Sequence, residues 1–167
     1  MTTSSEYQAD GQLVDAALDA LPALGLYIVA SLPAAADAVP VPRADARVER
    51  FLPHGLVLDR AVVAITHGGM GATQKALARG IPVCAVPFGR DQFEVARRVE
   101  VSGAGSRLPA KKLRADRLRS AVRTAMTRGA GARRVAAGYA AAGGPPAAAD
   151  AVEARLLGRT LAQPPGA

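Results

Sequence analysis

The sequence has few of the residues that build disulfides and metal sites. It contains one cysteine, Cys84, so no disulfide can form within the chain. The only two histidines, His54 and His67, lie apart in the sequence and do not make a metal-binding cluster. Cys84 itself falls in the apolar run PVCAV, which indicates a small buried hydrophobic side chain. We therefore expect neither a disulfide framework nor a bound metal ion.

Aromatic residues and lysines are also scarce. The 167 residues include three tyrosines, three phenylalanines and no tryptophan, and lysine occurs only at positions 75, 111 and 112. The formal net charge of +7 would suit a nucleic acid partner. However, almost all of the cations are arginines scattered among alanines, and few rings are present on which bases could stack. This composition is typical of a GC-rich genome, and we do not expect nucleic-acid binding.

No stretch of the sequence has the form of a membrane span or a secretion signal. Residues 20–36 are uncharged, but Pro22 and Pro33 interrupt them and the stretch is short for crossing a bilayer. The N-terminal residues MTTSSEYQADG contain no basic region followed by an apolar core. We expect a cytoplasmic protein without stable insertion into a membrane.

Predicted strands and helices alternate along the chain. Half of the residues are hydrophobic, which favours one folded domain over residues 1–158 with a frayed tail at 159–167. Apolar runs predict strands at 24–31, 47–51, 61–65, 82–86 and 105–108. Helical spacing predicts helices at 10–21, at 71–79, from 91 onward with Phe93, Ala96 and Val99 inward, around 118–125 and at 147–157. This order predicts an α/β fold, a Rossmann-like doubly wound parallel sheet with helices on both faces.

The most informative segment is the glycine-rich turn HGGMG at residues 67–71. It follows the apolar run 61–65 and precedes a helical pattern. Glycine has no side chain to keep a ligand away, and the first N–H groups of a helix point toward whatever lies before it. Such a turn favours an anion, most often a phosphate, although the turn alone is equally compatible with tight packing and no ligand.

Two better known phosphate-binding motifs do not fit this turn. A P-loop requires Gly-Lys followed by Ser or Thr, whereas Lys75 stands between Gln74 and Ala76. The dinucleotide fingerprint G-x-G-x-x-G could begin at Gly69, but Gln74 occupies the place of its third glycine. The sequence therefore supports neither nucleotide hydrolysis nor NAD binding.

A second turn, PFGRDQ at residues 87–92, follows the next predicted strand. In an open parallel sheet, ligands bind outside the carboxyl ends of the strands, which is where both turns are expected. We therefore predict that the two turns meet at one cleft. Asp91 and Gln92 suit sugar hydroxyls, since a carboxylate accepts hydrogen bonds and an amide both donates and accepts them. Asp91 is equally suited to cap the helix that follows.

Residues 51–99, which read FLPHGLVLDRAVVAITHGGMGATQKALARGIPVCAVPFGRDQFEVARRV, resemble the donor-sugar signature of the UDP-glycosyltransferase superfamily. The HGG-x-G turn, the G-x-P-x-x-x-x-P run and the DQ pair are in register with that signature. The superfamily contains two-domain GT-B enzymes, including the antibiotic and macrolide glycosyltransferases of actinobacteria. The resemblance implies that the chain is the C-terminal half of a GT-B fold, with a nucleotide sugar as co-substrate and no separate cofactor.

The resemblance also implies that the domain is shortened at its beginning. In the family, the first strand of this domain leads into a loop that resembles TTSSE at residues 2–6, so Met1 leaves room for only the end of that strand. We expect a truncated first strand and a weakened sheet. The histidine that acts as general base belongs to the family's N-terminal acceptor domain, which implies no catalytic residue in this chain. A truncated gene, a misplaced start codon and half of a split enzyme stay open, and a separate acceptor-binding domain or chain is an expected partner.

The resemblance assigns substrate-binding roles to a set of residues in the two turns and before them. Phe51 would stack on the nucleobase, unless it is a core phenylalanine, and His54 would bond the edge of the base. His67 would contact the diphosphate, with a structural role as its alternative. Asp91 and Gln92 would hold sugar hydroxyls. The full set is Phe51, His54, His67, Gly68, Gly69, Met70, Gly71, Ala72, Lys75, Asp91 and Gln92.

Two positions of this set depart from the family pattern. Ala72 replaces a frequent Ser or Thr, and whether the neighbouring Thr73 takes over that hydroxyl contact stays open. Lys75 replaces a glutamate that accepts hydrogen bonds from the ribose. Because lysine only donates, Lys75 either attracts the diphosphate or points into solvent.

The resemblance thus implies a glycosyltransferase donor domain of hexosyltransferase type. It would bind a UDP- or dTDP-sugar for inverting transfer to a hydroxyl of a small-molecule or lipid acceptor. We expect the chain to be inactive alone. The alternatives are a GT-B sugar-nucleotide epimerase domain, which the spacing of HGGMG and DQ fits less well, and a non-catalytic truncated remnant.

Overall fold

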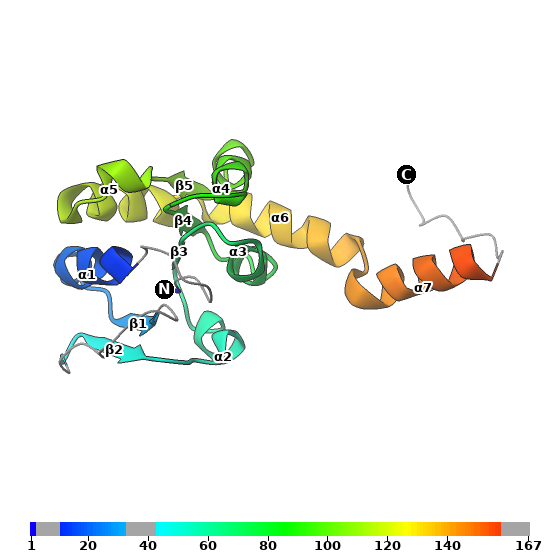
Figure 1. Ribbon diagram of the computed structural model, residues 1–167, viewed down its shortest axis with the longest axis horizontal. Helices are drawn as coiled ribbons and strands as arrows, with labels where there is room; N and C mark the ends of the chain where they lie inside the picture. Colours follow the sequence, from blue (N-terminus) through cyan, green and yellow to red (C-terminus); the bar gives the residue numbers. More distant parts are fainter. Residues whose placement is uncertain (3–10, 33–42, 158–167) are drawn as a thin grey trace.

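The computed structural model describes residues 1–2, 11–32 and 43–157. Its strands form two small parallel sheets that lie next to each other (Figure 1). β1 pairs with β2, and the other three strands follow the order β3-β4-β5. The strands are β1 (Ile28–Ser31), β2 (Ala46–Glu49), β3 (Ala64–Thr66), β4 (Val83–Ala85) and β5 (Gly105–Arg107).

The N-terminal residues join the two sheets. Thr2 forms parallel bridges with Ser31 of β1 and with Thr66 of β3. Its N–H donates to the carbonyl of Ile65 at 3.0 Å, and the N–H of Ser31 donates to the carbonyl of Met1 at 3.2 Å. Met1 and Thr2 therefore lie between β1 and β3.

Helices cover both faces of the sheets. α1 and α5 pack against one face, and α3, α4 and α6 pack against the other. α2 lies beside α3, and α7 reaches away from the sheets (Figure 1). The doubly wound α/β architecture is therefore confirmed. The helices are α1 (Gly11–Ala20), α2 (His54–Leu58), α3 (Met70–Leu77), α4 (Gln92–Val101), α5 (Ala115–Met126), α6 (Gly129–Ala141) and α7 (Gly144–Leu156), with 3₁₀ turns η1 (Pro22–Leu24) and η2 (Ala110–Lys112).

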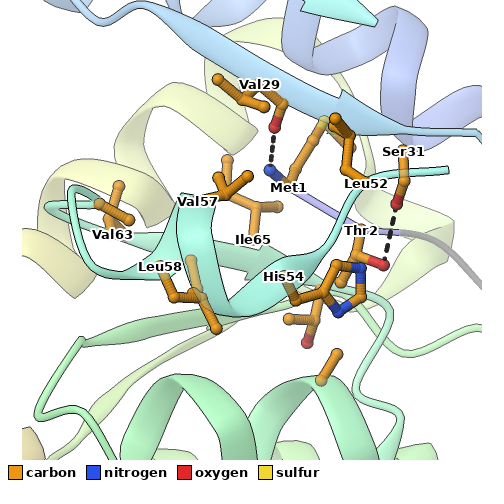
Figure 2. Close-up of a pocket in the computed structure, with 14 residues that line it drawn as sticks. Met1, Thr2, Val29, Ser31, Leu52, His54, Val57, Leu58, Val63 and Ile65 are labelled. Carbon is orange, nitrogen blue, oxygen red and sulfur yellow. Dashed lines mark hydrogen bonds between the residues drawn. The ribbon is translucent and has the colours of Figure 1, made fainter. Parts of the chain in front are cut away.

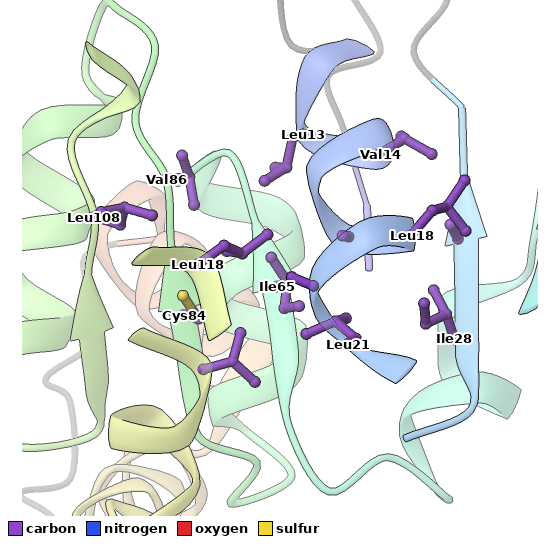
Figure 3. Packing of buried hydrophobic residues seen from close by; sticks show 14 of the residues in the cluster. Leu13, Val14, Leu18, Leu21, Ile28, Ile65, Cys84, Val86, Leu108 and Leu118 are labelled. Carbon is purple, nitrogen blue, oxygen red and sulfur yellow. The ribbon is translucent and has the colours of Figure 1, made fainter. Parts of the chain in front are cut away.

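The two faces of the sheets have cores of different character. Successive side chains along a strand point to opposite faces, and Ile65 and Cys84 point toward α1 and α5. On that side Leu13 and Leu118 are fully buried (Figure 3). Small residues dominate the opposite side, so its elements must approach each other closely. The buried residues there are Ala64, Ala76, Leu77, Ile81, Val83, Ala85, Ala96, Val99, Ala104 and Ala132.

The predicted inward face of α4 is confirmed at Ala96 and Val99 but not at Phe93. Phe93 is 50% exposed, while Val95 is buried together with Ala96 and Val99. Gln92 is buried at the first position of α4, and residues three and four positions later lie on the same face of a helix. That face includes Val95 and Ala96 and excludes Phe93. The prediction that Phe93 points inward is therefore wrong.

α2 and α6 are not apparent in the sequence pattern. α2 has only five residues, which is too few to show a helical period. α6 reads GAGARRVAAGYAA, where alanine and glycine fill most positions on every face. Its attachment to the core depends on Gly131 and Ala132, the only buried residues of the helix. The frayed tail predicted at 159–167 lies outside the described residues.

The spacing between α6 and the loop before β5 is set by Gly131. A Cβ at this position would collide with the carbonyl of Gly103, whereas Gly138 of the same helix has nothing within 4 Å of the corresponding position. We expect Gly131→Ala to lower the free energy of unfolding by about 1–3 kcal/mol through overpacking. We expect the matched control Gly138→Ala to raise it by about 0.5–1 kcal/mol. Urea denaturation measures both changes, and equal effects would contradict this packing.

Candidate functional site

The two turns predicted to meet do lie against each other. β3 and β4 are parallel neighbours, so the turns that follow them share one edge of the sheet. A Cβ added to Gly68 would lie 3.0 Å from the backbone oxygen of Gln92 and 3.3 Å from its Cβ. The first turn therefore touches the beginning of α4, and both segments belong to one site.

The first turn needs glycine at two positions for different reasons. Gly68 has a φ of +86°, a left-handed backbone conformation that side chains disfavour. Gly69 has an extended backbone, but a Cβ there would collide with the imidazole of His67. His67 therefore folds over Gly69 and lies half-buried beside the start of α3.

The N-terminus of α3 is open to solvent. Gly69 is the N-cap residue, and no side chain caps the helix. The first N–H groups of an α-helix, here those of Met70, Gly71 and Ala72, have no acceptor within the helix itself. Met70 and Gly71 are exposed and Ala72 is half-buried. These N–H groups and the positive end of the helix dipole can therefore face an anion.

Thr73 does not supply the hydroxyl that Ala72 lacks. Its side chain is 2% exposed and faces Thr66, with 3.2 Å between the two hydroxyl oxygens. Thr66 in turn accepts a hydrogen bond from the N–H of Gly68 at 3.0 Å. Thr66 is not among the site residues predicted from the sequence. The available signal was a hydroxyl residue at the end of an apolar strand, directly before the glycine-rich turn.

Gln92 holds the second turn from the inside. Its side chain is buried, and its Oε1 accepts hydrogen bonds from the N–H of Phe88 at 2.9 Å and the N–H of Gly89 at 3.2 Å. Arg90 has a φ of +55°, which is uncommon for any residue except glycine. Asp91 is exposed at the N-cap position of α4, and its side chain makes no capping hydrogen bond. The carboxylate of Asp91 thus lies at the surface of the turn.

Phe51, His54 and Lys75 form a separate part of the candidate site, around α2 and α3. Phe51 is 82% exposed, so its interpretation as a core phenylalanine is wrong. His54 is the first residue of α2, which lies beside α3. Burial lowers the pKa of His54, and the positive charge of Lys75 lowers this pKa further. Lys75 is exposed, yet its positive charge is close enough to His54 to lower the pKa of that imidazole.

A small cavity lies between β1, the N-terminal residues, α2 and β3 (Figure 2). Its volume is about 50 Å³, which is room for a few water molecules. The amine of Met1 donates to the carbonyl of Val29 at its edge, and burial lowers the pKa of this amine to about 6. Because the cavity is too small for a nucleotide, the candidate site is the outer surface formed by the two turns and α2. The polar lining residues are Thr2, Ser31, His54 and Thr66, and the apolar remainder is Met1, Val29, Leu52, Val57, Leu58, Ala61, Val63, Ala64, Ile65 and Ala72.

Other kinds of site are not found in the part of the chain that the structure describes. No group of three or more His, Cys, Asp or Glu side chains there could hold a metal ion. No helix in the described ranges is long and apolar enough to cross a membrane. Cys84 is fully buried, and burial raises the pKa of its thiol to about 11, so it is a thiol at neutral pH.

The neighbourhood of His54 predicts how this residue titrates. We expect its imidazole to titrate below the ordinary value of about 6.5. Lys75→Gln should raise the pKa of His54 without restoring the ordinary value, because burial is the larger cause. Titration of the imidazole followed by NMR measures both shifts. An unchanged pKa in Lys75→Gln would show that the two side chains do not interact.

The same shift predicts the pH dependence of stability. Above about pH 6.5 His54 is neutral in both the folded and the unfolded chain, so its contribution is constant. As the pH falls below this value, the unfolded chain binds the proton first, and the free energy of unfolding decreases. We expect His54→Gln to lack this component of the acid destabilisation. Urea denaturation of both proteins between pH 5 and pH 8 measures it, and parallel profiles would contradict the prediction.

Comparisons with known proteins identify the family of this chain. Residues 15–154 match the family described as erythromycin biosynthesis protein CIII-like, C-terminal domain. The 4'-demethylrebeccamycin synthase of Lentzea aerocolonigenes is 38% identical over 110 residues, which is 66% of this chain and 26% of that protein. A PGL/p-HBAD biosynthesis rhamnosyltransferase of Mycobacterium bovis is 34% identical over 116 residues, which is 70% of this chain and 26% of that protein. The matched part thus spans about a quarter of the length of these curated relatives.

Solved structures show the same relation. The calicheamicin glycosyltransferase CalG4 has a TM-score of 0.82 and 28% identity, with 93% of this chain and 42% of that chain covered. The glycosyltransferase of kitacinnamycin has a TM-score of 0.73 and 28% identity, with 91% of this chain and 42% of that chain covered. The chain therefore belongs to the erythromycin biosynthesis protein CIII-like C-terminal domain family and corresponds to the C-terminal domain of family 1 glycosyltransferases with the GT-B fold.

Proposed function

We propose that this chain is the donor-binding part of a glycosyltransferase that uses a UDP- or dTDP-sugar. The observation that carries the proposal is the contact between the two turns, where Gly68 lies against Gln92. This contact brings the open N-terminus of α3 and the exposed carboxylate of Asp91 to one edge of the sheet. An anion-binding helix end beside an acceptor for hydroxyl groups matches the two ends of a sugar diphosphate.

The diphosphate would bind at the start of α3. The N–H groups of residues 69–72 would donate to its oxygens, with the helix dipole adding a favourable field. His67 folds over Gly69 at this point, where its imidazole would donate another hydrogen bond. Negative charge on the diphosphate increases as the sugar leaves. Donors that are already in place at such a position stabilise the transition state more than the bound substrate.

The nucleoside would lie toward α2. The exposed ring of Phe51 offers a face for the base, and stacking adds roughly 0.5–1.5 kcal/mol beyond the area that it buries. His54 is neutral at pH 7 because its pKa is lowered, so it can donate one hydrogen bond and accept another. Lys75 cannot accept hydrogen bonds from ribose hydroxyls. Its charge would instead attract the diphosphate.

The sugar would contact the second turn. The carboxylate of Asp91 would accept hydrogen bonds from sugar hydroxyls, since it is exposed and does not cap α4. Gln92 would contribute mainly by holding the second turn in place, because its Oε1 already accepts hydrogen bonds from the N–H groups of Phe88 and Gly89.

Transfer would proceed with inversion at the anomeric carbon. An acceptor hydroxyl forms the new carbon–oxygen bond while the bond to the diphosphate breaks, and a general base takes the hydroxyl proton. The nucleoside diphosphate leaves with the electron pair of the broken bond. We propose that the base and the acceptor pocket belong to a second domain or chain. The proposal agrees with the 26% share of the curated relatives that the matched part of this chain spans.

Ligand binding tests the donor site directly. Calorimetric titration with UDP, UDP-glucose and dTDP-glucose should show saturable binding of at least one of them. We expect His67→Ala to weaken the binding of all bound ligands by about tenfold or more. Asp91→Ala should weaken the sugar nucleotide and leave UDP nearly unchanged. Asp116→Ala is a matched control, because Asp116 is also an exposed carboxylate at the beginning of a helix. A cooperatively folded protein that binds none of these ligands would refute the donor site.

Activity tests the need for a second domain. We expect the purified chain, given UDP-glucose or dTDP-glucose and a mixture of hydroxylated acceptors, to form no glycoside above the uncatalysed rate. The physical reason is that the proposed general base and acceptor pocket belong to a second domain or chain. Chromatography with mass detection measures the product. Rapid transfer by the isolated polypeptide would contradict the proposal.

A further inference from the structure

The hydroxyls of Thr66 and Thr73 form a small polar group beneath the glycine-rich turn. Thr66 is the last residue of β3 and Thr73 lies in the first turns of α3, and both side chains are almost completely buried. Their hydroxyl oxygens are 3.2 Å apart. The N–H of Gly68 donates to Thr66 Oγ1 at 3.0 Å. The end of the strand, the turn and the helix are thus joined through one hydroxyl.

This arrangement limits where the backbone of Gly68 can lie. On one side its N–H is bonded to Thr66. On the other side, a Cβ added to Gly68 would lie only 3.0 Å from the backbone oxygen of Gln92 and 3.3 Å from its Cβ, which leaves little room for a side chain. Its φ of +86° excludes most residues as a replacement. Gly68 is therefore held between a hydrogen bond and a close packing contact.

The polar pair is costly if it serves packing alone. A buried hydroxyl loses its hydrogen bonds to water, and that loss is offset only when it finds partners within the protein. Two valines would fill the same space in this largely apolar region without any such requirement. The pair instead satisfies the N–H of Gly68, a backbone donor in a turn that no strand or helix would otherwise pair.

We propose that Thr66 and Thr73 are positioning residues of the donor site, acting through the amide of Gly68. The inference rests on the proposed function of the turn as the diphosphate site. Thr73 orients the hydroxyl of Thr66, Thr66 fixes Gly68, and Gly68 sets the direction of His67 and of the first N–H groups of α3. The pair touches neither phosphate nor sugar. It matters because preorganised donors bind an anion without the cost of reordering the turn.

Isosteric substitutions test this role. Thr73→Val and Thr66→Val keep the shape of the side chain and remove the hydroxyl, and Thr73→Ser keeps the hydroxyl and removes a methyl group. Ser106→Ala is the matched control, because Ser106 is a buried hydroxyl on β5 that donates to the carbonyl of Ala121 at 2.7 Å, outside the two turns. Urea denaturation places the four variants on one scale of stability.

The first readout is the affinity for UDP. We expect Thr73→Val and Thr66→Val to weaken UDP binding roughly threefold to tenfold. Thr73→Ser should bind like the unchanged protein, and Ser106→Ala should lose stability without losing affinity. Equal UDP affinity in Thr73→Val and the unchanged protein would overturn the inference while leaving the donor site intact. Absence of UDP binding in the unchanged protein would instead count against the proposed function.

The second readout needs no ligand, so it tests the inference whether or not the unchanged protein binds UDP. Amide hydrogen exchange followed by NMR reports the protection of the Gly68 N–H. We expect this amide to exchange several-fold faster in Thr66→Val and Thr73→Val than in the unchanged protein, Thr73→Ser and Ser106→Ala. Unaltered protection of Gly68 in both valine variants would show that the hydroxyl pair does not hold the turn, whatever the affinity for UDP.

Discussion

The close approach of two turns is the constraint on which the rest of the site depends. Gly68 lies against the backbone of Gln92 because it lacks a side chain, and its left-handed backbone and the tight space around it disfavour other residues. This contact becomes available only because β3 and β4 are parallel neighbours that end at the same edge. The helices that follow both turns then begin beside each other. An anion at α3 and a hydroxyl group at Asp91 can therefore belong to one ligand.

Close packing of small side chains extends over one whole face of the sheets, the face covered by α3, α4 and α6. The core between the sheets and α3, α4 and α6 consists mainly of alanine and valine, and glycines stand where backbones meet. Gly131 contacts Gly103 in the same manner as Gly68 contacts Gln92. Such a core buries less apolar area for each residue than a core of leucine and phenylalanine, so its stability depends on close fit. The opposite face, with Leu13 and Leu118, supplies the larger hydrophobic contribution (Figure 3).

The sequence predicted those strands and helices whose hydrophobic pattern is long and regular enough to recognise. Apolar runs at 61–65 and 82–86 indicated β3 and β4, and helical spacing indicated α1 and α5. α2 was too short and α6 too rich in alanine to show a period. Ala96 and Val99 of α4 are buried as predicted, but Phe93 is half exposed while Gln92 and Val95 are buried. The buried side chain of Gln92 bonds the preceding turn, and a hydrophobic pattern does not reveal such a polar contact.

The sequence by itself determined the glycine-rich turn, the DQ pair, their order along the chain and the family to which these motifs belong. Each of these features is local, so neighbouring residues are enough to define it. Only the tertiary structure decided that Thr73 pairs with Thr66, that the oxygen of Gln92 serves its own turn, and that the charge of Lys75 acts on His54. These relations depend on which face of a helix is buried and which segments become neighbours. Both are set by packing between distant parts of the chain, which no local pattern of residues contains.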